Sequence, residues 1–292
     1  MEKLISIGQI LDQTIDHYAK HFKNIMKFSL WFLLVSLFLI ISGLLLPIAD
    51  IGSLATESIS TTSLVGSILM IISTLILAPV VSLWIYISIV QSTHKQRQGQ
   101  TIDHKAIAKT SWKQFFPYIW VSILRTLVLL IPLAAVIPGL ALILINLVAD
   151  GGVWLGTLSI LLTFLGSIVG IIILIMLSVQ LGFVGFTMVL ENKRGLASLK
   201  TSRELVKGRF WHTFVRLLVP KIAFTAAIVI FQFILFAISS PLIAFGATDT
   251  AVAAHITDVV NNVITGGITV LSVPLYIIAD YLIYDSLRTT KK

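Results

Sequence analysis

Six long runs without a charged residue constrain this chain more than any other feature. A transmembrane helix needs about 20 apolar residues, because each helical residue rises about 1.5 Å and the hydrocarbon core is about 30 Å thick. Every run reaches that length. The runs cover residues 28–49, 58–93, 126–149, 151–190, 222–248 and 259–279.

The composition supports a membrane protein. Only 12% of the residues are charged, whereas soluble domains have about 25%, so a water-soluble globule could not cover its surface. Strands of a membrane barrel would be about 10 residues long and would alternate polar with apolar residues. Stretches such as "LWFLLVSLFLIISGLLL" show no alternation, and we therefore predict helices.

The predicted fold is an all-α, polytopic transmembrane bundle. The third and fourth spans are long, so we expect tilt or local breaks there, and Pro132 and Pro138 would bend the third. The first apolar run is too long for a signal peptide and lacks a cleavage site, so none is expected. The six predicted spans are 26–47, 65–90, 117–146, 156–188, 213–239 and 263–286.

The distribution of Lys and Arg predicts the orientation. Three inter-span segments, 48–62, 147–155 and 240–262, contain neither residue. The termini and the remaining segments carry all the positive charge outside the spans, including six Lys and Arg residues between Lys193 and Arg209. Short basic loops stay cytoplasmic. We therefore predict a multi-pass protein of the cell membrane with both termini in the cytoplasm.

The basic segment before the fifth span is predicted to be an amphipathic interfacial helix. Its apolar face would consist of Leu196, Leu199, Val206 and Phe210. Its basic face would meet the anionic headgroups of membrane lipids, the expected partners. Nucleic acid is not expected, because the same charge bias occurs in every inner segment. The residues predicted to face anionic lipids are Lys200, Arg203, Lys207 and Arg209.

A similar construction occurs three times. The segments "IGQILDQTIDHYAKHF", "TIDHKAIAKTSWKQFFPYIW" and "GLASLKTSRELVKGRFWHTF" precede spans one, three and five. We predict one integral membrane domain, 1–292, with three repeat-like units near 1–92, 93–190 and 191–292, each a surface helix followed by a hairpin. A second explanation of the similarity stays open. Any transmembrane hairpin that starts on the cytoplasmic side needs basic and aromatic residues where it enters the membrane, so the three segments could resemble one another without duplication.

The stretch "LENKRGLASLKTSRELVKGRFWHTF" resembles a segment of the glycerophosphoryl diester phosphodiesterase membrane-domain family and of related uncharacterised six-span bacterial and archaeal proteins. The resemblance implies the six-span fold. Some members of that family attach a soluble phosphodiesterase barrel, which is not expected here because only a short tail follows span six, so the hydrolase activity does not transfer. The residues that carry the resemblance are Glu191, Ala197, Leu199, Ser202, Leu205, Gly208, Phe210 and Trp211.

Charged residues within spans are costly and are candidates for function. Arg125, Lys221 and Asp280 lie at comparable predicted depth, so we expect Asp280 to pair with Arg125 or Lys221. Tyr276 and Tyr284 share a helix face with Asp280 and complete a candidate polar cluster. The pair would either line a cavity or proton path, or lock helices together.

Other patterns are assigned structural roles. Gly166 and Gly170 are predicted to allow close helix packing, and His17 and His21 are predicted to be a solvated pair. The sequence has no cysteine and none of the common hydrolase or nucleotide-binding motifs. No catalytic residue, cofactor or metal site is therefore predicted, and an enzyme is not expected.

Two functions remain from the sequence. The first is a non-enzymatic membrane protein that organises or interacts with lipids or partner proteins. The alternative is a transporter, or a permease that handles lipids or small molecules, with a cavity between helices near Asp280.

Overall fold

The computed structural model describes residues 4–46, 60–149, 152–246 and 250–290, and every regular element in those ranges is helical. In chain order the helices are α1 (Ile7–Lys20), α2 (Phe22–Ser29), α3 (Phe32–Leu45), α4 (Thr61–Ile72), α5 (Ala78–Arg97), α6 (His104–Leu130), α7 (Ile137–Ala149), α8 (Gly152–Gln180), α9 (Val184–Glu191), α10 (Leu196–Val206), α11 (Phe210–Gly246) and α12 (Thr250–Thr289).

Six stretches are long and apolar enough to cross a membrane, as the sequence predicted. Their limits extend the predicted spans at most ends. They are Phe22–Leu45, Thr61–Arg97, His104–Ala135, Gly152–Glu191, Phe210–Pro241 and Ile256–Thr289.

The third and fourth spans are broken, which confirms the expectation of local breaks. A 3-10 turn at Ile131–Ala135 separates α6 from α7, and it contains Pro132, which lacks the N–H that a continuing α-helix needs. In the fourth span, α8 ends at Gln180 and α9 begins at Val184. The second span also departs from regular geometry, since a π-helical turn at Ser73–Leu77 joins α4 to α5.

The three predicted surface helices differ from one another. α1 and α10 are separate helices that precede spans one and five. The segment before span three is not separate, because α6 runs without a break from His104 to Leu130. The threefold repeat itself stays a prediction.

The chain divides into two compact units. The helices α6, α11 and α12 each contribute residues to both. The first unit is Met1–Leu4, Phe116–Leu217 and Tyr284–Lys292, and the second is Ile5–Phe115 and Leu218–Ile283.

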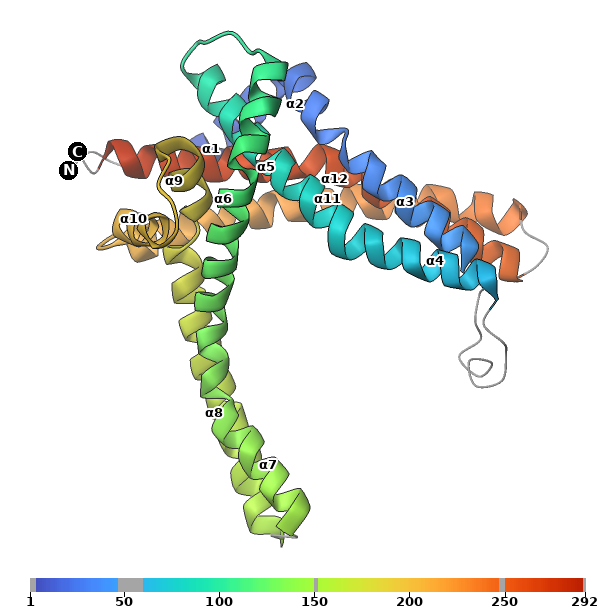
Figure 1. The fold of residues 1–292 in the computed structure, drawn as a ribbon, viewed down its shortest axis with the longest axis vertical. Helices are drawn as coiled ribbons and strands as arrows, with labels where there is room; N and C mark the ends of the chain where they lie inside the picture. The colour runs from blue at the N-terminus through green and yellow to red at the C-terminus, as the bar shows by residue number, and fades with distance from the viewer. Residues whose placement is uncertain (1–3, 47–59, 150–151, 247–249, 291–292) are drawn as a thin grey trace. The chain divides into compact units, whose positions relative to one another are not determined.

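In the first unit, α7 and the preceding turn pack against α8 through small residues (Figure 1). A methyl group added to Gly166 would overlap the carbonyl oxygen of Ala135, and one added to Gly139 would overlap Thr163. A methyl group on Gly170 would lie 3.0 Å from the carbonyl oxygen of Pro132. The glycines therefore permit a close helix approach, which confirms the packing role predicted for Gly166 and Gly170.

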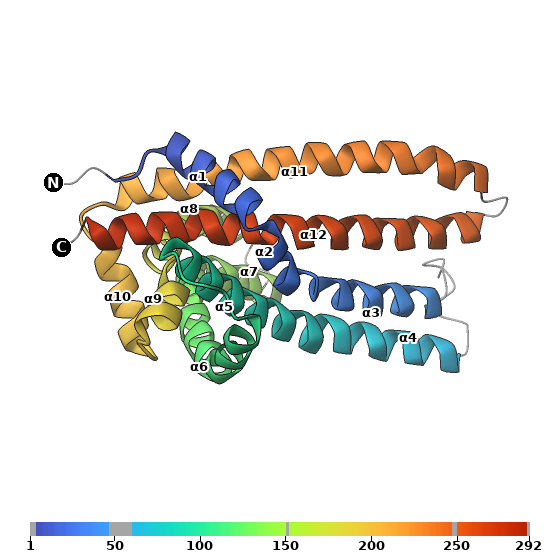
Figure 2. The ribbon, with the colours of Figure 1, turned by 90° about the horizontal axis from the view of Figure 1, so that it is seen from above.

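In the second unit, α3 and α4 run beside the parts of α11 and α12 that belong to this unit (Figures 1 and 2). The Ser42 hydroxyl donates to the Gly66 carbonyl at 2.8 Å and links α3 to α4. The Tyr18 hydroxyl donates to the Leu271 carbonyl at 3.0 Å and holds α1 on α12. α1 is therefore bound to protein on at least one side.

Candidate functional site

The basic helix α10 lies against the broken part of the fourth span. Its buried residues are Ser198, Leu199, Ser202, Leu205 and Val206, and the helix contacts α8 and α9. The predicted apolar face is therefore only partly right, since Leu196 is 69% exposed. Neither Ser198 nor Ser202 was assigned to a face of the helix from the sequence, because only the apolar and the basic residues were considered.

The two serines complete the hydrogen bonding of the helix break. The Ser202 hydroxyl donates to the Gln180 carbonyl at 2.7 Å and accepts from the Phe183 N–H at 3.2 Å. Ser198 donates to the Val184 carbonyl at 2.8 Å, and its hydroxyl lies 2.7 Å from that of Thr187. Backbone groups freed by a break would be costly in an apolar setting. These contacts fix α10 on the end of the span.

The opposite side of α10 carries the cations predicted to face lipid. Lys200, Arg203 and Lys207 are all exposed. They line a pocket of about 390 Å³, in which Glu204 is the single acidic lining residue among those that the structure describes. The remaining lining residues are Gln180, Val206, Gly208 and Phe210. A hollow with three cations and one carboxylate favours anions.

Arg209 differs from these three residues. Its Nη1 donates to the Thr290 hydroxyl at 2.5 Å and its Nη2 donates to the Thr290 carbonyl at 3.1 Å. Both contacts hold the start of α11 on the end of α12. Two of the guanidinium N–H groups of Arg209 therefore already have acceptors in the protein, and that Arg209 faces anionic lipid stays a prediction.

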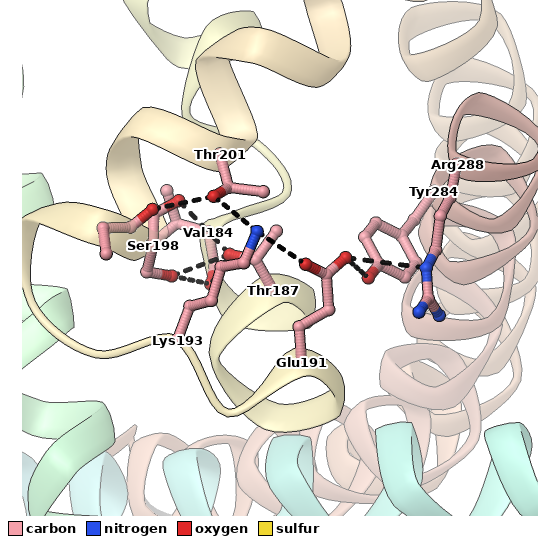
Figure 3. Close-up of polar contacts among 9 residues, drawn as sticks. Val184, Thr187, Glu191, Lys193, Ser198, Thr201, Tyr284 and Arg288 are labelled. Carbon is pink, nitrogen blue, oxygen red and sulfur yellow. Dashed lines mark hydrogen bonds and ion pairs between the residues drawn. The ribbon is translucent and has the colours of Figure 1, made fainter. Parts of the chain in front are cut away.

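A charged cluster around Glu191 lies at the end of α9 (Figure 3). Tyr284 donates to Glu191 Oε1 at 2.6 Å, and Lys193 Nζ lies 3.1 Å from Oε2. Arg288 Nε lies 3.7 Å from Oε1. Lys193 also donates to the Thr201 hydroxyl at 3.0 Å. One carboxylate thus connects the end of α9, the start of the α10 segment and the last turns of α12.

The turn after α9 directs Lys193 back toward this carboxylate. Asn192 has a φ of 53°, a left-handed conformation that asparagine tolerates and that commonly ends helices. Gly195 has a φ of 57°, which a residue with a side chain rarely adopts. Glu191 was among the residues that carried the family resemblance, but its contacts with Tyr284 and Arg288 join residues 93 or more positions apart and gave no local signal.

The candidate polar cluster of the spans is divided between the two units. Lys221 Nζ lies 3.0 Å from Asp280 Oδ2, so the predicted pairing of Asp280 is confirmed with Lys221 as a partner. One helical turn away, four residues after Lys221 on α11 and four residues before Asp280 on α12, the Thr225 and Tyr276 hydroxyls lie 2.8 Å apart. These two contacts link α11 and α12 within the second unit.

The other two cluster members belong to the first unit. Tyr284 binds Glu191. Arg125 lies on α6 and is partly buried, and its Nε makes no hydrogen bond to a residue that the structure describes. A role of the five residues as one functional cluster stays a prediction.

The prediction of a solvated histidine pair is wrong for His17. Its side chain is buried, and its Nε2 donates to Gln96 Oε1 at 2.8 Å. Burial, followed by the nearby charge of His21, lowers the pKa of His17 to about 4, although the hydrogen bond opposes this. Within the described ranges no three His, Cys, Asp or Glu side chains are grouped as a metal site would require.

Comparisons of the chain with protein-family models, with curated proteins and with solved structures give no match. The resemblance to the membrane-domain family therefore stays a prediction.

Proposed function

We propose that this chain is a multi-pass membrane protein that binds anionic lipid headgroups through α10 and so organises lipids, or proteins associated with them, at the cytoplasmic face of the cell membrane. The observation that supports it most directly is the pocket lined by Lys200, Arg203 and Lys207. Catalysis forms no part of the proposal.

Fixation of α10 supports binding by these three residues. Ser198 and Ser202 hold the other side of the helix on the fourth span. The three cations therefore keep their spacing without a lipid, so less ordering entropy opposes binding. An interfacial helix that floated freely would have to order itself on each encounter.

The charge distribution of the whole chain supports the orientation. The three segments without Lys or Arg alternate with basic ones along the six spans, and basic segments remain in the cytoplasm. α10 then lies on the inner side, where anionic lipids give the leaflet its negative potential.

The expected strength of the interaction is moderate. A Lys or Arg near an anionic surface contributes about 1 kcal/mol, so three contribute about 3 kcal/mol, or about a hundredfold in affinity at low salt. Salt would screen this attraction, because the Debye length is about 8 Å at physiological ionic strength.

The test replaces the three cations together as Lys200→Gln, Arg203→Gln and Lys207→Gln in the full chain. Native mass spectrometry would count the phosphatidylglycerol molecules that remain bound after detergent exchange, with phosphatidylcholine as the neutral comparison. We expect at least a tenfold loss of phosphatidylglycerol retention and little change for phosphatidylcholine.

A matched control makes the same charge change elsewhere: Lys105→Gln, Lys109→Gln and Lys113→Gln, all exposed on α6. This variant should retain most of the phosphatidylglycerol. An equal loss in both variants would assign the binding to general surface charge, and an unchanged first variant would exclude α10 as the site.

The alternative function, a transporter or permease with a cavity near Asp280, rests on the Lys221–Asp280 pair. Each charge in this pair already has an opposite charge within 3.0 Å. That arrangement favours a structural link between α11 and α12 over a vacant substrate site.

A further inference from the structure

Three tryptophans surround a pocket in the second unit. None of its lining residues comes from α10. Trp31 precedes α3, Trp84 lies on α5 and Trp112 lies on α6. The pocket has a volume of about 220 Å³. Its other lining residues are the aliphatic side chains Leu34, Leu77, Val80 and Val81.

Trp84 is the central ring of the group. Its centroid lies 5.9 Å from that of Trp31, edge to face, and 6.2 Å from that of Trp112. Trp84 is only 9% exposed, whereas Trp31 and Trp112 are each about half exposed. The outer two indoles therefore form the rim of the pocket and Trp84 forms its inner wall.

The indole N–H of Trp84 lacks an acceptor among the residues that the structure describes. Its Nε1 is buried and makes no hydrogen bond to any residue in the described ranges. A buried N–H without a partner is costly, and buried indoles usually have an acceptor. Trp84 lines the pocket, so an acceptor that enters the pocket would lie beside the indole that carries this N–H.

The position of the pocket along the spans points to the lipid ester region. Trp31 and Trp84 lie about 8 Å inside the sequence-predicted ends of spans one and two. Trp112 lies about as far before the sequence-predicted start of span three at residue 117, on the part of α6 that begins at His104. The pocket therefore lies at the boundary between the headgroup region and the acyl chains, where tryptophan is enriched.

We propose that this pocket binds an ester-linked acyl chain of a membrane glycerolipid. The ester carbonyl accepts a hydrogen bond from the Trp84 indole N–H. The first methylene groups of the chain lie against Leu34, Leu77 and Val80. This site is separate from α10, since it recognises the linkage between glycerol and the acyl chain and not the headgroup.

A quaternary ammonium headgroup is the competing occupant, because aromatic faces attract cations. Among the described residues, the lining contains no carboxylate. An unpartnered donor requires an acceptor, which a quaternary ammonium group cannot provide. The ester carbonyl fits both the apolar wall and the indole N–H.

The test compares two lipids that differ only in the carbonyl group. Full-length protein in detergent would be titrated with a diester phosphatidylglycerol and with the diether lipid that has the same headgroup and chain length. Trp84→Phe removes the N–H and keeps an aromatic ring, and Trp154→Phe, an exposed position, is the matched control.

Wild-type protein and Trp154→Phe should bind the diester about five- to tenfold more tightly than the diether, as expected for one hydrogen bond. Trp84→Phe should bind both lipids equally. The wild-type comparison needs no variant, so the proposal stays testable even if Trp84→Phe fails to fold.

Two outcomes would overturn this proposal: equal wild-type binding of diester and diether lipids, or retained discrimination in folded Trp84→Phe. Because the two lipids share one headgroup, neither outcome depends on whether α10 binds anionic lipid. Conversely, the variant with Lys200→Gln, Arg203→Gln and Lys207→Gln should still bind the diester lipid more tightly than the diether lipid, even if it no longer prefers anionic headgroups.

Discussion

Ser202 shows how one small side chain can replace hydrogen bonds that a helix has lost. The hydroxyl donates to the Gln180 carbonyl and accepts from the Phe183 N–H, on either side of the break in the fourth span. Ser202 is fully buried, so water cannot take the place of a partner from the protein. The hydroxyl of serine can donate and accept at once, whereas alanine could do neither.

His17 is the residue for which the structure most changes the sequence interpretation. Its imidazole is enclosed by the second unit and donates to Gln96, so the neutral form is favoured. The ordinary pKa of about 6.5 applies to the unfolded chain, and the pKa of the folded state is about 4. The unfolded state therefore binds more protons between these two values.

We predict that His17 makes the folded protein less stable in acid. The free energy of unfolding should be at its full value, as far as His17 is concerned, above pH 6.5. It should fall by up to about 3 kcal/mol as the pH falls toward 4. Thermal unfolding in detergent at pH 7.5, 6.0 and 5.0 would measure this. His17→Gln should reduce the pH dependence, while the exposed control His212→Gln should leave it intact. Identical slopes for wild type and His17→Gln would contradict the burial.

At the scale of elements, α11 and α12 are joined by two polar contacts one helical turn apart. Lys221 pairs with Asp280, and Thr225 pairs with Tyr276. The side chain of Lys221 is 43% exposed and that of Asp280 is 23% exposed. In a span, lipid surrounds such exposed surface in place of water, so an unpaired charge costs more there than on a soluble protein.

Asp280→Asn should therefore destabilise the protein by about 1 to 3 kcal/mol, because Lys221 would keep its charge without a partner. Lys221→Met should have a similar effect. The double variant should recover part of the loss, since neither charge remains. A double-mutant cycle of thermal unfolding measures the coupling energy. Additive losses would exclude a direct interaction.

The α7–α8 hairpin shows a different way to join elements. Gly139, Gly166 and Gly170 bring backbones together without polar side chains. Much of the remaining surface of this hairpin is apolar and open, with Val148 and Val153 each almost 90% exposed. Exposed apolar side chains of this extent suit a lipid environment and would be unusual on a monomer in water.

At the scale of the molecule, the six spans and the sorting of Lys and Arg predict an even number of crossings. Reporters fused after Lys292 and inserted near Gly151 should lie in opposite compartments, with the first in the cytoplasm. An insertion between Gln98 and Gln100 serves as the control and should match the C-terminus. If the C-terminal and Gly151 reporters shared a compartment, the orientation and the inner position of α10 would both be wrong.

The sequence by itself determined the spans, because insertion depends on the local sum of apolar side chains over about 20 residues. It also named Pro132 and Pro138 as positions that bend the third span, and the structure has its 3-10 turn at Pro132, although Pro117, Pro220 and Pro274 lie inside continuous helices. Tertiary structure alone decided that Lys221 pairs with Asp280, that Tyr284 binds Glu191, that the serines of α10 are buried and that His17 is enclosed. Such contacts join residues distant in sequence, and helical periodicity cannot specify which neighbour each face meets.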